Sequence, residues 1–312
     1  ASSALNAPVG RLSAILFADP SLPNPADGTG LPDAWKQRAE QLLALPGDSR
    51  SQALVMLGHH SVYLHAVDAE WVEEHLIPFA NTRTDAADAI WEGLLWGARI
   101  PGLNLFRELK IGLLDQARDR MREGQRTENI AGFLLQGWAD GAADNSGEAL
   151  ISDEELRDVL IDANDGVRRG IIHYLGLFRE QHPEKWHDLV LPFFQKVWPR
   201  QRALKTAPMS QVLVRFILDS GDLFPDLVKL LKSRLAPLRD GDGWLFAVNV
   251  EEEDTPVKKY PHETLDLLWG LLPDDASQWR FEIGKVMQEL EDSSVTRGDP
   301  RLSEIRLRLG RY

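Results

Sequence analysis

The chain has 312 residues, with 35 Lys and Arg against 48 Asp and Glu, a formal net charge of −13 and no cysteine. The lack of cysteine excludes disulfides, thiolate metal sites and cysteine nucleophiles, which fits a cytoplasmic protein. The acidic balance repels phosphate, so a nucleic-acid partner would need a local basic patch. No window approaches the ~18 consecutive apolar residues of a membrane helix, and we expect no membrane partner.

Apolar residues recur at helical spacing along nearly the whole chain, whereas the strict alternation typical of strands is almost absent. Proline and capping residues mark several helix starts, and Ser152 with Glu155 has the pattern of a capping box. We therefore predict an all-α protein. The predicted helices span residues 32–45, 49–67, 69–80, 85–98, 128–141, 152–163, 166–180, 183–198, 210–220, 224–236, 262–272, 277–290 and 300–309.

Three connections between these helices are longer than the others. Residues 19–31 and 140–151 are rich in turn-forming residues, and we expect them on the surface. Residues 239–260 include LFAVNV beside an acidic run at 251–254. We predict at most one short β-hairpin, near residues 244–250, and a solvated acidic run.

An internal repeat relates residues 53–79 to residues 170–193. Each segment has an apolar helix, a Leu-Gly pair, a polar turn, a Trp and a Leu-Ile-Pro-Phe or Val-Leu-Pro-Phe sequence. A helix pair cannot bury its apolar face alone, so we predict an irregular HEAT-like α-solenoid or stacked helical hairpins. A plain irregular helical bundle is the alternative. We predict an N-terminal lobe at 1–139 and a C-terminal lobe at 152–312, unless the helices form one continuous array.

The motifs that carry common chemistry are missing. The sequence has no phosphate-binding GxxxxGK[ST], no GxGxxG, no GxSxG and no HExxH. His59, His60 and His65 share a predicted helix, but not at the i,i+4 spacing that lets two ligands converge on a metal. Residues 162–173 begin like a calcium loop yet end in His173, where a bidentate Glu belongs. We predict no catalytic, cofactor-binding or metal-binding residue, and no cofactor.

One short segment stands out as a candidate interaction site. Most of the ten tryptophans lie at helical spacing from Leu and Phe, as in a packed core. Trp198 instead opens WPRQRALKT, in which Arg200, Arg202 and Lys205 crowd together. A Trp beside Arg is the composition of a protein-binding hot spot. We predict that these four residues contact a partner; the alternative is a buried Trp at a helix end with solvated arginines.

Residues 198–238 and 260–291 resemble an all-helical, HEAT-like bacterial domain of unknown function. That domain lies C-terminal to sirtuin-like, NAD-consuming domains in proteins implicated in defence against phage. Weaker similarity covers residues 5–16 and 44–57. The resemblance implies a sirtuin-like domain upstream of this chain. The sirtuin Gly-Ala-Gly, Asn-Ile-Asp and His-Gly elements are absent from the 312 residues, so no NAD-site residue is assigned.

The leading hypothesis is a non-catalytic helical recognition and assembly module of a larger bacterial protein, since the chain also starts without a Met. Its partner would be a protein: the upstream domain, a second copy of the chain, or a phage protein. An enzyme with scattered helix-borne Asp, Glu, His and Arg is one alternative. A nucleic-acid-binding helical repeat is the least favoured alternative, and it needs one basic face formed by Arg200, Arg202, Lys205, Lys229, Lys232 and Arg234.

Overall fold

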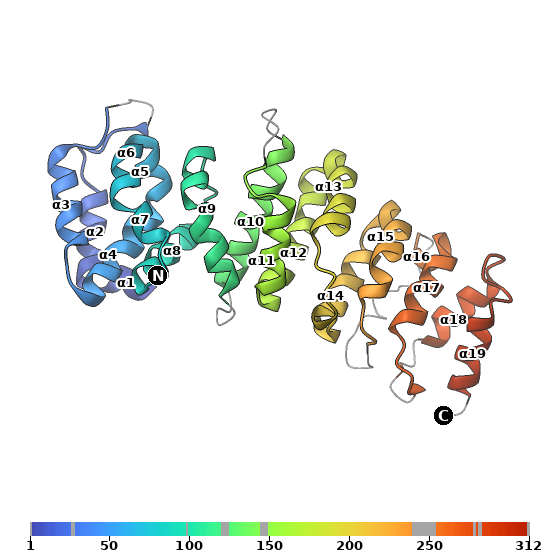
Figure 1. Cartoon of the computed structure of the whole chain (residues 1–312). Helices are drawn as coiled ribbons and strands as arrows, with labels where there is room; N and C mark the ends of the chain where they lie inside the picture. Colours follow the sequence, from blue (N-terminus) through green and yellow to red (C-terminus); the bar gives the residue numbers. More distant parts are fainter. Residues whose placement is uncertain are drawn as a thin grey trace. The chain divides into compact units, whose positions relative to one another are not determined.

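A computed structural model describes residues 2–25, 29–97, 99–119, 125–143, 149–238, 254–276, 279 and 283–310. These residues form helices and connections without a strand, so the predicted all-α class is confirmed (Figure 1). The β-hairpin predicted near residues 244–250 lies outside the described residues. No helix in the described ranges is both long and apolar enough to cross a membrane.

The chain divides into two compact units, unit 1 at residues 1–171 and unit 2 at residues 172–312. The boundary falls within one helix, α12, rather than in a connection. The lobes predicted at 1–139 and 152–312, and the HEAT-like solenoid, stay predictions.

Three of the described helices of unit 1, α1, α2 and α9, are absent from the predicted helices. Pro8 opens α2, and buried Leu105, Leu109 and Leu113 give α9 a regular apolar face. The helices are α1 Ser2–Asn6, α2 Pro8–Phe17, α3 Asp33–Leu43, α4 Gly47–His59, α5 Ser61–Val67, α6 Ala69–His75, α7 Ile77–Ala80, α8 Asp85–Gly97, α9 Leu103–Arg118, α10 Gln125–Ala143, α11 Asp153–Asp162 and the first part of α12 Asp165–Gln181. Ser152 caps α11 and forms the predicted capping box with Glu155.

Helix α4 lies at the centre of unit 1. Its residues 53–58 are all buried, because α4 contacts α1, α2, α3, α5 and α8. Where α4 meets α8 the two backbones touch. A Cβ atom added to Gly93 would lie 2.0 Å from the Val55 carbonyl oxygen, and one added to Gly58 would lie 2.4 Å from the Ile90 carbonyl oxygen. Glycine at both positions therefore allows the close approach of α4 and α8.

Tryptophan side chains fill much of the core, as their spacing predicts. The Trp35 indole N–H donates to the Leu16 carbonyl oxygen at 2.9 Å, and the Trp91 indole N–H donates to the Ala80 carbonyl oxygen at 2.9 Å. These bonds satisfy a donor that burial would otherwise leave without a partner. The buried tryptophans of the described residues are Trp35, Trp71, Trp91, Trp138, Trp186, Trp198 and Trp279.

The described part of unit 2 consists of short helices, most of which have a proline at the first or second position. Proline suits the first turn because its missing N–H would have no partner there. The described α-helices after α12 are α13 Trp186–Pro192, α14 Ala207–Leu218, α15 Phe224–Leu231, α16 Pro256–Lys259, α17 Pro261–Leu271, α18 Ile283–Asp292 and α19 Pro300–Leu309. The other helical turns are η2 Pro183–Lys185, η3 Phe193–Val197, η4 Arg202–Leu204, η5 Gly221–Leu223 and η6 Lys232–Arg234.

The turn η6 is fixed in place by α14 and α17. The Ala236 N–H donates to the Ser210 hydroxyl oxygen at 2.7 Å, just after η6 ends. Lys232 forms an ion pair with Asp266 of α17, and Asp266 also accepts a hydrogen bond from Arg301 of α19 at 2.6 Å. These contacts hold Ser233 and Arg234 against the segment that follows η3.

Candidate functional site

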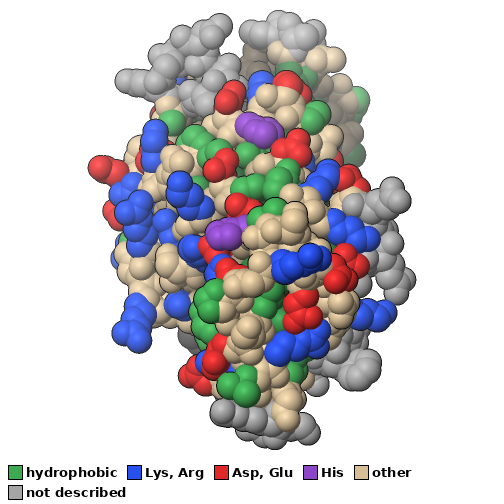
Figure 2. Space-filling model, turned by 90° about the vertical axis from the view of Figure 1, so that its right-hand side faces the viewer, with side chains coloured by type: hydrophobic (Ala, Val, Ile, Leu, Met, Phe, Trp, Pro, Cys, Tyr) green, Lys and Arg blue, Asp and Glu red, His purple; other side chains and the backbone are tan. Residues whose placement is uncertain are grey.

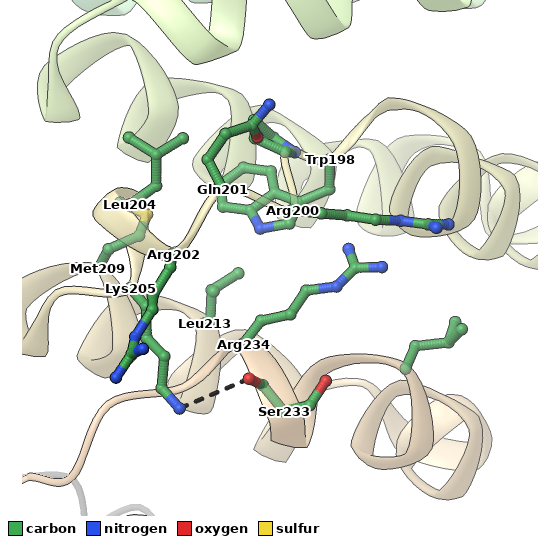
Figure 3. Close-up of a pocket in the computed structure, with 12 residues that line it drawn as sticks. Trp198, Arg200, Gln201, Arg202, Leu204, Lys205, Met209, Leu213, Ser233 and Arg234 are labelled. Atoms are coloured by element: carbon green, nitrogen blue, oxygen red, sulfur yellow. Dashed lines mark hydrogen bonds between the residues drawn. The ribbon is translucent and has the colours of Figure 1, made fainter.

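A pocket of about 530 Å³ lies in unit 2, and the described residues that line it come from three segments (Figure 3). The first segment is 198–205, the connection between η3 and α14. The second is the start of α14, with Met209 and Leu213. The third is the end of α15 with η6, which supplies Leu230, Ser233 and Arg234. All four residues of the predicted interaction site line this pocket.

Local hydrogen bonds shape the 198–205 segment. The Trp198 N–H donates to the Phe193 carbonyl oxygen at 2.9 Å and ends η3. The chain then makes one 3₁₀ turn, η4, before Thr206 caps α14 by accepting the Met209 N–H at 3.3 Å. The segment is therefore held at both ends. Its basic side chains extend from a short connection that is not α-helical.

Trp198 joins the pocket to the aromatic core. The residue is only 5 % exposed, and its indole packs against Phe194, with ring centroids 5.9 Å apart, and against Phe193, at 6.1 Å. The buried ring supplies an apolar wall, together with buried Met209 and Leu213. Trp198 therefore combines a place in the core with a place in the pocket lining.

Arg200 and Arg234 are held by carbonyl groups of two consecutive residues. An Arg200 Nη2–H donates to the Gln195 carbonyl oxygen at 2.9 Å, and an Arg234 Nη1–H donates to the Phe194 carbonyl oxygen at 3.0 Å. Burial and the nearby positive charge of Arg200 lower the pKa of Arg234 below its ordinary value. The two guanidinium groups are thus close neighbours of like charge, as Figure 3 shows.

Arg202 and Lys205 are both exposed and flank the η4 turn. The Lys205 ammonium group donates to the Ser233 carbonyl oxygen at 3.5 Å, at the long end of the hydrogen-bonding range (Figure 3). Neither cation has a carboxylate within ion-pair distance in the described part of the chain. Both side chains are therefore available to a ligand.

The pocket lining carries four positive charges and, among the described residues, no Asp, Glu or His. Elsewhere in unit 2, Lys232, Arg301 and Arg306 each pair with a carboxylate. Because the whole chain has a net charge of −13, the pocket is a local exception. Its field attracts anions, and the arrangement can hold them by charge-assisted hydrogen bonds.

Four of the lining residues share one segment of the sequence, whereas Arg234 comes from another. Arg234 lies 34 residues after Arg200 along the chain, and the sequence predicts the two together only in the alternative basic face. That face also included Lys232, which is instead paired with Asp266. Arg234 reaches the site because η6 packs against η3, where the Arg234 guanidinium donates to the Phe194 carbonyl oxygen.

His60, which lies between α4 and α5, has a packing role. The His60 ring stacks on Phe17 with centroids 3.8 Å apart, and burial lowers its pKa to about 4. No group of three or more His, Asp or Glu side chains that could hold a metal occurs among the described residues. In the segment with the calcium-loop pattern, Asp165 pairs with Arg168 and the Asn164 side chain accepts the Val167 N–H, so these residues stabilise the start of α12.

Comparison with known proteins gives one distant relative. The chain is 22% identical over 282 residues to the uncharacterized protein y4cA of Sinorhizobium fredii, an alignment that covers 87% of this chain and 23% of the relative. The chain thus spans about a quarter of the length of that protein. No family model matches the sequence, and no solved structure matches it.

Proposed function

We propose that this chain is a non-catalytic helical recognition module that binds an acidic segment of a partner protein through the pocket of unit 2. The observation that carries the proposal is the presence of Arg200, Arg202, Lys205 and Arg234 around one pocket without a neutralising carboxylate among the described residues. Arg234 is partly buried, where a charged group is usually paired. The four cations have no carboxylate partner among the described residues, which supports a ligand that supplies the missing negative charge.

The charge distribution supports selectivity as well as attraction. Away from the pocket the acidic chain repels an acidic partner, so only a segment that places its carboxylates between the four cations gains binding energy. Hydrogen bonds to charged groups contribute about 1.5–3 kcal/mol each. Trp198, Met209 and Leu213 offer apolar contact to the rest of such a segment.

The partner is a protein, and we include three sources in the proposal: an upstream domain of the same polypeptide, a second copy of this chain, or a phage protein. Control of an upstream NAD-consuming, sirtuin-like domain in phage defence belongs to the same proposal, and it rests on the sequence resemblance. A cytoplasmic location is part of it too.

Two other functions have less support. The enzyme alternative relies on Asp, Glu and His side chains for general acid–base catalysis, and the described pocket lining has none of them. A nucleic-acid-binding repeat needs an extended basic surface, but Lys232 is engaged by Asp266. The face drawn in Figure 2 mixes Lys and Arg with Asp and Glu side chains, a pattern that does not follow a phosphate backbone.

The proposal is tested with a fluorescent peptide library in which every member carries adjacent Glu residues. The pocket variant is the double substitution Arg202→Gln, Lys205→Gln, because both side chains are exposed and their loss leaves the core intact. Arg215→Gln, Lys229→Gln is the matched control, since it removes two exposed cations of α14 and α15 that do not line the pocket. Each exposed ion contact contributes up to about 1 kcal/mol.

We expect members of the library to bind the wild-type chain and to lose affinity by about tenfold or more in the pocket variant, since ~1.4 kcal/mol corresponds to tenfold. The control should keep its affinity within about twofold. Equal losses in the two double variants, or no binding at all, would contradict the proposal. Duplex DNA or RNA that binds with the same dependence on the pocket cations would favour the nucleic-acid alternative.

A further inference from the structure

One pair of neighbouring cations in the pocket, Arg200 and Arg234, has a geometry that suits a more highly charged group than a carboxylate. Their guanidinium groups come from different elements, the 198–205 segment and η6, yet are anchored by the carbonyl oxygens of Gln195 and Phe194. Each anchor uses one of the five N–H donors of a guanidinium, so most donors of both groups have no partner among the described residues. The anchors also reduce the side-chain entropy that a ligand would otherwise have to restrict.

Two adjacent positive charges require two negative charges for neutralisation. A carboxylate carries one, whereas a phosphate monoester carries about −1.5 to −2 at pH 7 and presents three acceptor oxygens. Planar guanidinium groups bind phosphate oxygens by pairs of hydrogen bonds, and the two neighbouring groups keep free N–H donors for such bonds. The Arg200 and Arg234 pair therefore fits a phosphate group better than a single carboxylate.

The size and lining of the pocket add a second requirement. A volume of about 530 Å³ lies in the range of sites for organic ligands and far exceeds the space that one phosphate ion needs. Buried Trp198, Met209 and Leu213 line the space beyond the arginine pair. A ligand that fills the pocket therefore has an organic group beside its phosphate.

We propose that the pocket binds a phosphate monoester, with its phosphate between Arg200 and Arg234 and its organic group against Trp198, Met209 and Leu213. This inference rests on the proposed role of the pocket as the site that receives a partner's anionic group, and it names the chemistry of that group. Arg202 and Lys205, across the pocket in Figure 3, contact a further anionic or carbonyl group of the same ligand. The phosphate monoester is carried either by a phosphorylated side chain of a protein or by a free metabolite.

The test is calorimetric titration of the full chain at constant ionic strength in chloride. The probes are phenyl phosphate, benzoate, inorganic phosphate and a peptide with one phosphotyrosine. The unphosphorylated form of the same peptide is its control. Phenyl phosphate should bind at least about tenfold more tightly than benzoate and than inorganic phosphate. Equal affinities for phenyl phosphate and benzoate would overturn the assignment of a phosphate, and equal affinities for phenyl phosphate and inorganic phosphate would overturn the role of the apolar wall.

Two variants locate the bound phosphate. Arg200→Gln should weaken phenyl phosphate at least about tenfold, and Arg200→Lys should recover only part of this loss because it keeps the charge without the fork. Arg200 is exposed, so these variants keep the fold, and circular dichroism checks it. Arg215→Gln is the control outside the pocket. Unchanged affinity in Arg200→Gln would overturn the inference.

The affinities of the phosphotyrosine peptide and of phenyl phosphate distinguish the two sources of the phosphate. Tighter binding of the phosphotyrosine peptide than of phenyl phosphate indicates a protein ligand, and the reverse order indicates a metabolite; both orders support the inference. If every phosphate probe fails while the acidic peptides bind through Arg202 and Lys205, the inference falls and the proposed function stands. If phenyl phosphate binds and no peptide does, the proposed protein partner is wrong and the phosphate site stands.

Discussion

Arg200 lies close enough to Arg234 for its positive charge to add to the effect of burial and lower the pKa of Arg234. No carboxylate of the described residues relieves this repulsion. Proteins tolerate such arrangements at functional sites, where stability is given up for ligand binding. The repulsion between Arg200 and Arg234 therefore lowers the stability of unit 2, and a bound anion would relieve it.

The first prediction concerns the cost of that pair in the free chain. Arg200→Gln removes the like charge beside Arg234. The substitution loses only an exposed hydrogen bond to the Gln195 carbonyl oxygen. We expect the thermal unfolding midpoint of this variant to be equal to or higher than that of wild type in chloride buffer, while its affinity for anionic ligands falls. A clearly lower midpoint would show that Arg200 stabilises the fold instead.

A second prediction concerns the contact between α4 and α8. Gly93→Ala places a Cβ atom 2.0 Å from the Val55 carbonyl oxygen, which is backbone and cannot rotate away. The helices must separate, and overpacking of this kind costs about 1–3 kcal/mol or more. Denaturant unfolding followed by circular dichroism should show the loss.

Gly176→Ala is the matched control for the helix contact. Gly176 lies within α12, and a Cβ atom there would meet nothing within 4 Å. Because Ala favours a helix over Gly by up to ~1 kcal/mol, this variant should be neutral or more stable. Equal destabilisation by the two substitutions would refute the role of Gly93 in helix spacing.

A third prediction concerns acid pH and the start of α19. Hydrogen bonds from the Arg301 side chain, above all, lower the pKa of Asp299 from 3.8 to about 2. A carboxylate with a lowered pKa in the folded state stabilises the fold above its unfolded pKa, and this contribution is lost as the pH falls through the folded value. We expect Asp299→Asn, which keeps a capping side chain, to unfold more easily than wild type at pH 7. The difference should shrink below pH 4; a difference that grows in acid would contradict the assignment.

Fold class follows from the sequence because apolar spacing and proline placement are local signals. Ser152 and Glu155 form the capping box that their spacing predicts. The contact of Gly93 with Val55 depends on how two helices cross, and no local pattern encodes that crossing.

The candidate site is only partly local. Trp198, Arg200, Arg202 and Lys205 share one segment, so their composition identifies them as a group. Arg234 reaches the same pocket because η6 packs against η3, through the bond of its guanidinium to the Phe194 carbonyl oxygen. Lys232 lies two residues earlier in the same turn but pairs with Asp266, so charge alone does not tell these two residues apart.

The central claim is that the pocket of unit 2 is where this module receives its partner. Hydrogen–deuterium exchange of the full chain, with and without the tightest acidic or phosphorylated peptide, tests this most directly. We expect slower exchange in residues 198–206 and 230–236 when the peptide is bound, with unit 1 unchanged. Protection confined to other helices, with these two segments unaffected, would show that the partner binds elsewhere.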